Sequence, residues 1–236
     1  MKTIGILGGM SWESSSIYYQ LINERVKETL GGHHSAKCVL FSVDFQPIKD
    51  LQHEGRWEEA TERLVDSVKS IEKAGADFLI IGTNTMHKIA DEIEATTSIP
   101  LLHIADMTGE EIKNRGLKRL GLLATKFTME QDFYKGRLQT NSNLDIIVPD
   151  EQDRNTVHDI IYDELCLGKV KEASKQKYLD ITNKLIHEGA EGIILGCTEI
   201  TMLVKESDIQ VPVFDTTKIH AIKAADYAMN HFVLNR

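Results

Sequence analysis

The chain has 236 residues, of which 42% are hydrophobic, and a formal charge of −9 at neutral pH. This charge, without any cluster of Lys and Arg, argues against a general nucleic-acid-binding protein, because the neutralisation of phosphates needs a basic surface. The longest strictly apolar runs have four residues, far fewer than the roughly 20 that a membrane helix needs. We therefore expect a cytoplasmic protein that binds neither nucleic acid nor membrane.

The first third of the chain alternates between predicted strands and predicted helices. An apolar strand over 4–7 precedes a glycine turn and a helix that ends at Gly31. A second strand over 37–43 is followed by a helix that ends near Gly75 and by a fully apolar strand over 78–81. Apolar strands that alternate with helices predict an α/β protein with a parallel sheet covered on both faces.

The same order of elements returns in the second half of the chain. Residues 75–83 align with 189–197 at an offset of 114, 2–7 with 118–123 at 116, and 99–102 with 211–214 at 112. Three blocks in one order at nearly one offset predict two similar α/β lobes. We expect the first lobe to comprise 1–106 with 208–236 and the second to comprise 107–207, although the strand-like block 211–214 could join either lobe.

Small and polar residues follow several of these strands. Ligands of open parallel sheets bind beyond the carboxyl ends of the strands, and glycines, hydroxyls and backbone N–H groups there suit a carboxylate. The sequence therefore predicts a small, anionic ligand. The residues concerned are 8–11, 82–87, 124–125 and 196–199.

The chain has three cysteines, an odd number that argues against a disulfide framework. Cys197 stands where a buried strand gives way to a helix, a place where a thiol pKa can fall below its usual value of about 8.5. Cys197 is thus a candidate base or nucleophile, and the alternative is a small buried filler. Cys38, within an apolar strand, and Cys166, between leucines, are predicted to be core residues.

Three segments together carry a family resemblance. Residues 82–87 (GTNTMH), 196–200 (GCTEI) and 8–12 (GGMSW) resemble motifs of the aspartate/glutamate racemase family, and the resemblance extends over nearly the whole chain. It implies a cofactor-independent amino-acid racemase that commonly forms homodimers. It also implies two flavodoxin-like lobes, related by pseudo-twofold symmetry, that enclose the substrate and each supply one acid/base residue, normally a cysteine.

The offset of 114 pairs Cys197 with Thr83, which stands where the family generally has its first cysteine. An alcohol ionises at a pKa close to that of water and far above the value of about 8.5 for a thiol, so Thr83 should be a poor proton abstractor. We expect Cys197 to remove the α-proton, from the L-enantiomer according to the resemblance, and Thr83 to be the weaker proton donor on the opposite face. The alternatives are a broad-specificity racemase, a related isomerase and a noncatalytic binder of small amino acids on the same fold.

The resemblance further implies a set of substrate-binding residues at the strand ends. Without the family, several of them are simply helix-capping residues. Family members that prefer aspartate use basic side chains, whereas Gln52 and Leu167 stand near the corresponding positions here, with Lys169 close by. We expect an acidic amino acid, aspartate or glutamate, without strict specificity for aspartate. The set is Met10, Gln52, Asn84, Thr85, Met86, Thr125, Thr198 and Glu199.

Neither a metal nor a nucleotide cofactor is predicted. The nine histidines lack paired ligand spacing, and the glycines of residues 5–9 lack the spacing of a dinucleotide-binding turn. His87, one turn beyond Thr83, is either a structural histidine or a support for the site.

Overall fold

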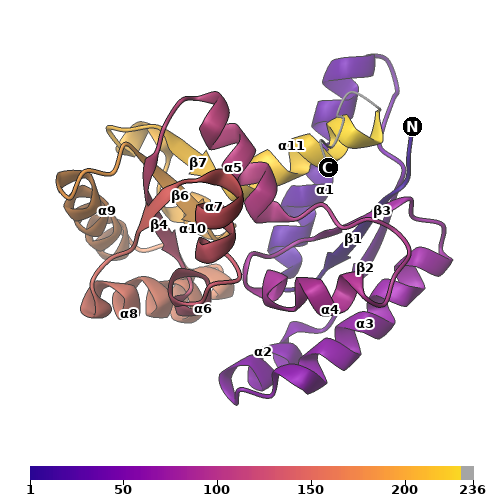
Figure 1. Ribbon diagram of the computed structural model, residues 1–236, viewed down its shortest axis with the longest axis horizontal. Coiled ribbons are helices and arrows are strands. Elements are labelled where there is room, and N and C mark those ends of the chain that lie inside the picture. Colours follow the sequence, from indigo (N-terminus) through magenta and orange to yellow (C-terminus); the bar gives the residue numbers. More distant parts are fainter. Residues whose placement is uncertain (230–236) are drawn as a thin grey trace. The chain divides into compact units, whose positions relative to one another are not determined.

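Two parallel β-sheets organise the residues that the computed structural model describes, 1–229 (Figure 1). The described chain divides into two units: Met1–Ile104 together with residues 220–229, and Ala105–Ile219. His231, one of the nine histidines considered as metal ligands, and the end of the predicted first lobe lie within 230–236, outside the described residues. The predicted α/β class with parallel sheets is confirmed.

The sheet of unit 1 has the strand order β2-β1-β3, with every strand parallel to its neighbour. Its strands are β1 (Ile4–Gly8), β2 (Cys38–Ser42) and β3 (Phe78–Ile81). Its helices are α1 (Trp12–Leu30), α2 (Phe45–His53), α3 (Trp57–Lys73), the 3₁₀ helix η1 (Thr85–Ile89), α4 (Ala90–Glu94) and the greater part of α11 (Thr216–Ala228).

Helices cover both faces of the sheet in unit 1. Successive strand residues point to opposite faces, so Ile6 packs against α1 and α11 whereas Leu7 packs against α2, α3 and α4. The edge strand β2 departs from the prediction that every strand is covered on both faces. Leu40 and Phe41 are 42% and 37% exposed, and Cys38 is half-buried rather than a core residue, because only one strand lies beside β2.

Unit 2 contains a four-stranded parallel sheet of order β5-β4-β6-β7. Its strands are β4 (Arg119–Ala124), β5 (Asp145–Ile147), β6 (Gly192–Gly196) and β7 (Val213–Asp215). Its helices are α5 (Ile104–Asn114, from its second residue), α6 (Lys126–Glu130), α7 (Lys135–Ser142), α8 (Glu151–Asp159), the π-helical turn η2 (Ile160–Glu164), η3 (Leu165–Leu167), α9 (Glu172–His187), α10 (Ile200–Leu203) and η4 (Glu206–Asp208).

The placement of 208–219 with the first lobe is corrected by strand pairing. Strand β7 lies parallel to β6, with Ile194 opposite Phe214, so this segment belongs to unit 2. The sequence left both pairings open, because an apolar block of four residues fits the edge of either sheet.

The internal repeat reappears as equivalent strand register. Gly5 of β1 lies opposite Leu79 of β3, and Gly121 of β4 lies opposite Ile193 of β6, at the offsets of 116 and 114. Both glycines allow a close approach: a Cβ on Gly5 would lie 2.5 Å from Cγ2 of Ile71, and one on Gly121 would lie 2.8 Å from Cδ1 of Ile193. Close packing therefore requires a glycine at the equivalent position of β1 in unit 1 and of β4 in unit 2.

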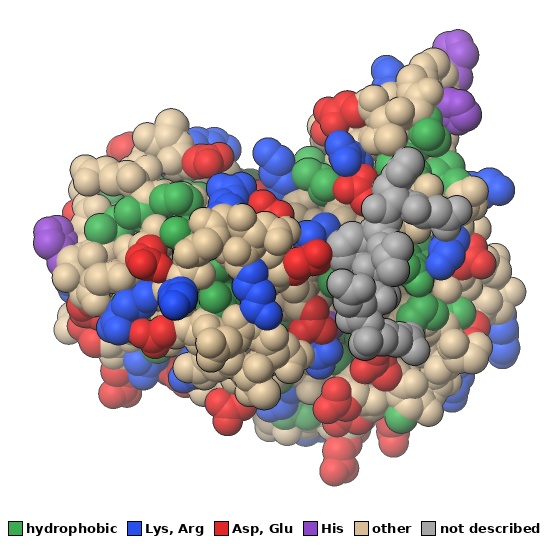
Figure 2. Space-filling model, turned by 45° about the horizontal axis from the view of Figure 1, so that its top comes forward, with side chains coloured by type: hydrophobic (Ala, Val, Ile, Leu, Met, Phe, Trp, Pro, Cys, Tyr) green, Lys and Arg blue, Asp and Glu red, His purple; other side chains and the backbone are tan. Residues whose placement is uncertain are grey.

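The surface carries charges of both signs. On the face shown in Figure 2, Lys and Arg side chains are interspersed with Asp and Glu rather than gathered into one area. Within residues 1–229, no helix combines the length and the apolar character required to cross a membrane.

Candidate active site

The end of β3 carries the predicted site residues of unit 1. The strand ends at Ile81, and η1 begins four residues later at Thr85. Asn84, Thr85 and the two residues that follow are buried, whereas Thr83 is half-buried. The N–H of His87 donates to the carbonyl of Asn84 at 3.1 Å and closes the turn. The polar residues that the strand-end rule singled out therefore form one continuous segment at the carboxyl end of β3.

Three predicted binding residues lie in or against one buried cluster of unit 1. Met10, directly after the turn that follows β1, and Met86 both belong to the apolar cluster on the α2–α4 face of the sheet. Gln52 is 2% exposed and donates from Nε2 to the sulfur of Met86 at 2.7 Å. The structure thus brings Gln52 and Met86 together and orients the buried amide.

The end of β6 carries the corresponding residues of unit 2. Cys197 follows Gly196 directly and is half-buried. Its thiol donates to Oε2 of Glu199 at 3.0 Å, and the Glu199 side chain is itself buried. A thiol and a carboxylate in direct contact form a pair that can exchange a proton.

The prediction of a lowered pKa for Cys197 is wrong. Burial, followed by the negative charge of Glu199 and the proximity of Cys166, raises the pKa of the Cys197 thiol well above its ordinary value. The expected helix, α10, has only the four residues Ile200–Leu203, so its N-terminus offers little dipole to oppose these effects. The resting group at neutral pH is therefore the protonated thiol.

The whole-chain comparison supplies the decisive observation. Residues 7–224 match the family model for Asp/Glu/hydantoin racemases. The chain belongs to the Asp/Glu/hydantoin racemase family. The resemblance carried by the strand-end motifs is thereby confirmed, together with the enzyme class.

Three relatives of this racemase family member place it among amino-acid racemases. A solved structure from Yersinia pestis, of a candidate Asp/Glu racemase, is 53% identical, with a TM-score of 0.91 over 97% of this chain and 100% of that one. An aspartate racemase homologue from Pyrococcus horikoshii OT3 is 33% identical, with a TM-score of 0.83 over the same shares. The broad specificity amino-acid racemase RacX of Bacillus subtilis (strain 168) is 23% identical over 91% of this chain and 92% of its own.

Hydroxyl groups hold the strand ends of unit 2 in the racemase fold. Thr217 donates to Oγ1 of Thr198 at 3.2 Å, and Thr216 donates to the carbonyl of Leu195 in β6 at 2.9 Å. Thr217 was missed as a neighbour of the site, although it follows a predicted strand and the strand-end rule would have included it. The predicted residue Thr125 lies at the end of β4, buried and 3.2 Å from the hydroxyl of Thr128.

Two further residues, Cys166 and Tyr162, interact electrostatically with Cys197. Cys166, predicted to be a core residue, is instead half-buried in η3, and it contributes to the raised pKa of Cys197. Tyr162, in the turn η2, is buried, and its pKa is raised first by burial and then by the proximity of Cys197. No sequence signal distinguishes such a tyrosine from a core side chain. The nearby Leu167, considered for a basic position, is 61% exposed.

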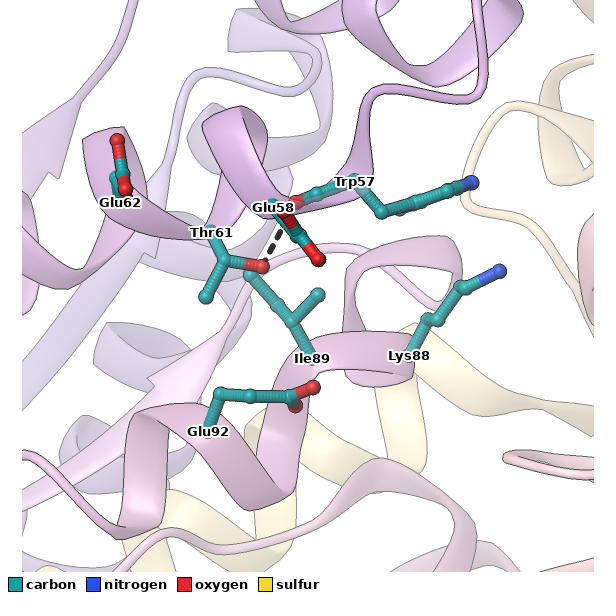
Figure 3. Close-up of a pocket in the computed structure, with 7 residues that line it drawn as sticks. All are labelled: Trp57, Glu58, Thr61, Glu62, Lys88, Ile89 and Glu92. Carbon is teal, nitrogen blue, oxygen red and sulfur yellow. Dashed lines mark hydrogen bonds between the residues drawn. The ribbon is translucent and has the colours of Figure 1, made fainter.

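A surface pocket of unit 1 lies outside the predicted set of residues. It encloses about 320 Å³ between α3 and the η1–α4 segment (Figure 3). The ammonium group of Lys88 lies 4.1 Å from the centroid of the Trp57 ring, and burial lowers the pKa of Lys88. The lining includes three glutamates, which disfavour an anionic ligand. The lining residues are Trp57, Glu58, Thr61, Glu62, Lys88, Ile89 and Glu92.

Clustered metal ligands are absent from the described part of the racemase. Among residues 1–229, no three His, Cys, Asp or Glu side chains are grouped so that they could hold a metal ion. Two of the buried histidines of unit 1, His87 and His220, instead bond to backbone groups and to a tyrosine.

Proposed function

We propose that this family member is a cofactor-independent racemase of an acidic amino acid, aspartate or glutamate. Cys197 removes the α-proton of the L-enantiomer, and the Thr83 hydroxyl supplies a proton to the opposite face of the carbanion. The proposal is carried by the direct contact, 3.0 Å, between the thiol of Cys197 and the carboxylate of Glu199. The family membership and the likeness to an aspartate racemase homologue support it.

Glu199 solves a difficulty that the raised pKa of Cys197 creates. A protonated thiol is not a base, so its proton must leave before the α-proton is taken. The carboxylate of Glu199 accepts that proton along the existing hydrogen bond. The resulting thiolate is a stronger base than one of ordinary pKa, which suits the abstraction of a weakly acidic C–H proton.

The proton steps balance over one turnover. The thiol proton of Cys197 passes to Glu199, and the C–H bond of the substrate breaks as its proton moves to the thiolate, with the electron pair left on the α-carbon. The Thr83 hydroxyl then donates its proton to form the new C–H bond, and water restores the hydroxyl. Glu199 releases its proton to water, so the thiol, the carboxylate and the hydroxyl return to their starting states.

The pairing of a thiol with a hydroxyl makes the two directions unequal. Starting from the D-enantiomer, Thr83 would have to act as the base, and an alcohol, which ionises at a pKa close to that of water and far above that of a thiol, is poorly suited to this. Because the two enantiomers have equal free energies, kcat/KM must nevertheless be the same for both. The difference between the two directions must therefore lie in the separate constants: we expect both kcat and KM to be lower for the D-enantiomer than for the L-enantiomer.

A broad-specificity racemase is the second candidate function. The likeness to RacX and the neutral, buried Gln52, where aspartate-preferring members have a basic side chain, favour it. Relative kcat/KM values for aspartate, glutamate and a neutral amino acid such as alanine separate the two candidates. The acidic-substrate proposal predicts at least about tenfold preference for the dicarboxylic substrates, as one lost charge-assisted hydrogen bond would produce.

The test of the reaction itself is deuterium exchange at the α-carbon of L-aspartate and L-glutamate in heavy water. We expect exchange with the wild-type protein and its loss in Cys197→Ala. Exchange that persists in Cys197→Ala would contradict the role of the thiol. The absence of exchange for any common amino acid in the wild type would favour a noncatalytic amino-acid binder. The homodimer and the cytoplasmic location stay predictions.

A further inference from the structure

His87 lies in a chain of hydrogen bonds that ends at the residue proposed to donate the second proton. Its ring is 1% exposed. Nδ1 lies 2.8 Å from the carbonyl oxygen of Thr83, and the backbone N–H of Ile104 donates to Nε2 at 3.2 Å. Both partners are backbone groups, so rotation of a neighbouring side chain cannot turn the donor into an acceptor or the acceptor into a donor.

These two partners determine the protonation state of His87. A backbone N–H can only donate, so Nε2 must be unprotonated, and a carbonyl can only accept, so Nδ1 must carry the hydrogen. A doubly protonated ring would place an N–H group against the N–H of Ile104. The ring is therefore neutral, in the Nδ1–H form, and it donates to Thr83.

A second histidine supports the segment that carries Ile104. Nε2 of His220 donates to the carbonyl of Leu102 at 2.8 Å, and the hydroxyl of Tyr18 donates to Nδ1 at 2.9 Å. Burial lowers the pKa of His220 to about 4, which keeps this ring neutral as well. The backbone around Ile104 is thus held on one side by His220 and bonded on the other to His87.

The bond from His87 orients the peptide unit between Thr83 and Asn84. In a trans peptide the C=O and N–H point in opposite directions, so holding the Thr83 carbonyl toward His87 directs the Asn84 N–H away from it. The same bond fixes the backbone of Thr83, and the χ1 rotamer of a β-branched residue depends on its backbone angles. The direction of the Thr83 hydroxyl therefore depends on a side chain four residues further along.

We propose that His87 is a positioning residue for the proton donor Thr83. It holds the Thr83–Asn84 peptide in the orientation that aims the hydroxyl at the substrate carbanion, without taking part in proton transfer. This inference rests on the proposed function, because it assigns the position of one of that reaction's two acid/base groups.

Two substitutions separate this role from a purely structural one. In His87→Asn, the amide nitrogen occupies about the place of Nδ1 and keeps the bond to Thr83 while the bond from Ile104 is lost. In His87→Gln, the amide oxygen reaches about the place of Nε2 and keeps the bond from Ile104 while the bond to Thr83 is lost. Each variant loses one of these two hydrogen bonds and the ring itself, so their melting temperatures are expected to be similar and each variant serves as the control for the other.

The readout is the ratio of D-aspartate formed to deuterium exchanged into recovered L-aspartate, at saturating substrate in heavy water. We expect this ratio to fall about tenfold in His87→Gln and to stay within about threefold of the wild type in His87→Asn, the effect of one lost orienting hydrogen bond. Equal ratios in the two variants would overturn the proposal. A wild-type protein without exchange would instead overturn the proposed function.

A spectroscopic measurement on the wild type tests the hydrogen-bond assignment independently of activity. In the ¹⁵N-labelled protein, the two ring nitrogens of a neutral histidine differ in chemical shift according to which carries hydrogen. We expect His87 to show the Nδ1–H form. The Nε2–H form or a doubly protonated ring would refute the positioning role, even if both variants failed to fold.

Discussion

Replacing Glu199 by glutamine should raise the rate at which Cys197 is alkylated and lower the rate at which it exchanges the α-proton of the substrate. The substitution removes a negative charge that lies 3.0 Å from the sulfur. At this distance a carboxylate and a thiolate repel each other by about 1.4 kcal/mol at the dielectric constant of water and by about 5.5 kcal/mol at an effective dielectric constant of about 20. Even the smaller figure corresponds to about tenfold more thiolate at a fixed pH. Glutamine, however, cannot accept the thiol proton, and the thiolate that remains is a weaker base.

The assay compares alkylation by iodoacetamide with α-proton exchange at one pH near neutrality. It uses a background in which Cys38 and Cys166 are serine, because both are half-buried and could react. We expect alkylation of Cys197 to rise at least about tenfold in Glu199→Gln. Exchange should fall about a hundredfold, as is typical when a general base is lost. Unchanged alkylation, or exchange that rises together with alkylation, would refute the proposed proton transfer to Glu199.

Three further predictions concern both chemistry and stability. Thr83→Cys should raise kcat for the D-enantiomer at least about tenfold in a polarimetric assay, because a thiol ionises far more readily than an alcohol; an unchanged kcat would argue against Thr83 as the second acid/base group. Gly5→Ala should lower the free energy of unfolding, measured by urea denaturation, by about 1–3 kcal/mol, because the new Cβ would lie 2.5 Å from Ile71. In the control Gly82→Ala the new Cβ would lie 3.4 Å from its nearest neighbour, so this variant should lose clearly less stability. Folding lowers the pKa of His220 from 6.5 to about 4, so the unfolded state takes up a proton first as the pH drops. The wild type should therefore lose about 1.4 kcal/mol of unfolding free energy per pH unit between about pH 6.5 and 4, relative to His220→Gln. Parallel profiles of stability against pH for the two proteins would refute this.

The sequence allowed the sheets to be predicted more fully than the protonation states of the site. The apolar strand over 78–81 and the block 189–197 have patterns that are typical of buried parallel strands, and their equivalent register follows from the repeat. The membership of β7 was ambiguous, because strand pairing depends on contacts distant in sequence. The exposure of Leu40 was unpredictable for a related reason, since an edge strand and a central strand can have the same apolar pattern.

The candidate site residues could be predicted from the sequence through the strand-end rule, but their electrostatics could not. The position of Cys197 after β6 followed from the pattern, whereas the raised pKa of its thiol results first from burial and then from the negative charge of Glu199, whose side chain lies against the sulfur. Likewise, the role proposed for His87 depends on the carbonyl of Thr83 and on the N–H of Ile104, which lies 17 residues away. Such contacts are set by tertiary packing.

The most direct test of the central claim is the fate of L-aspartate in heavy water with Thr83→Val, which removes the hydroxyl while nearly preserving side-chain shape. If Cys197 alone takes the α-proton and Thr83 only returns one to the opposite face, recovered L-aspartate should contain deuterium at its α-carbon while almost no D-aspartate forms. Formation of D-aspartate at the wild-type rate, or loss of exchange from L-aspartate in a folded Thr83→Val protein, would contradict this division of roles.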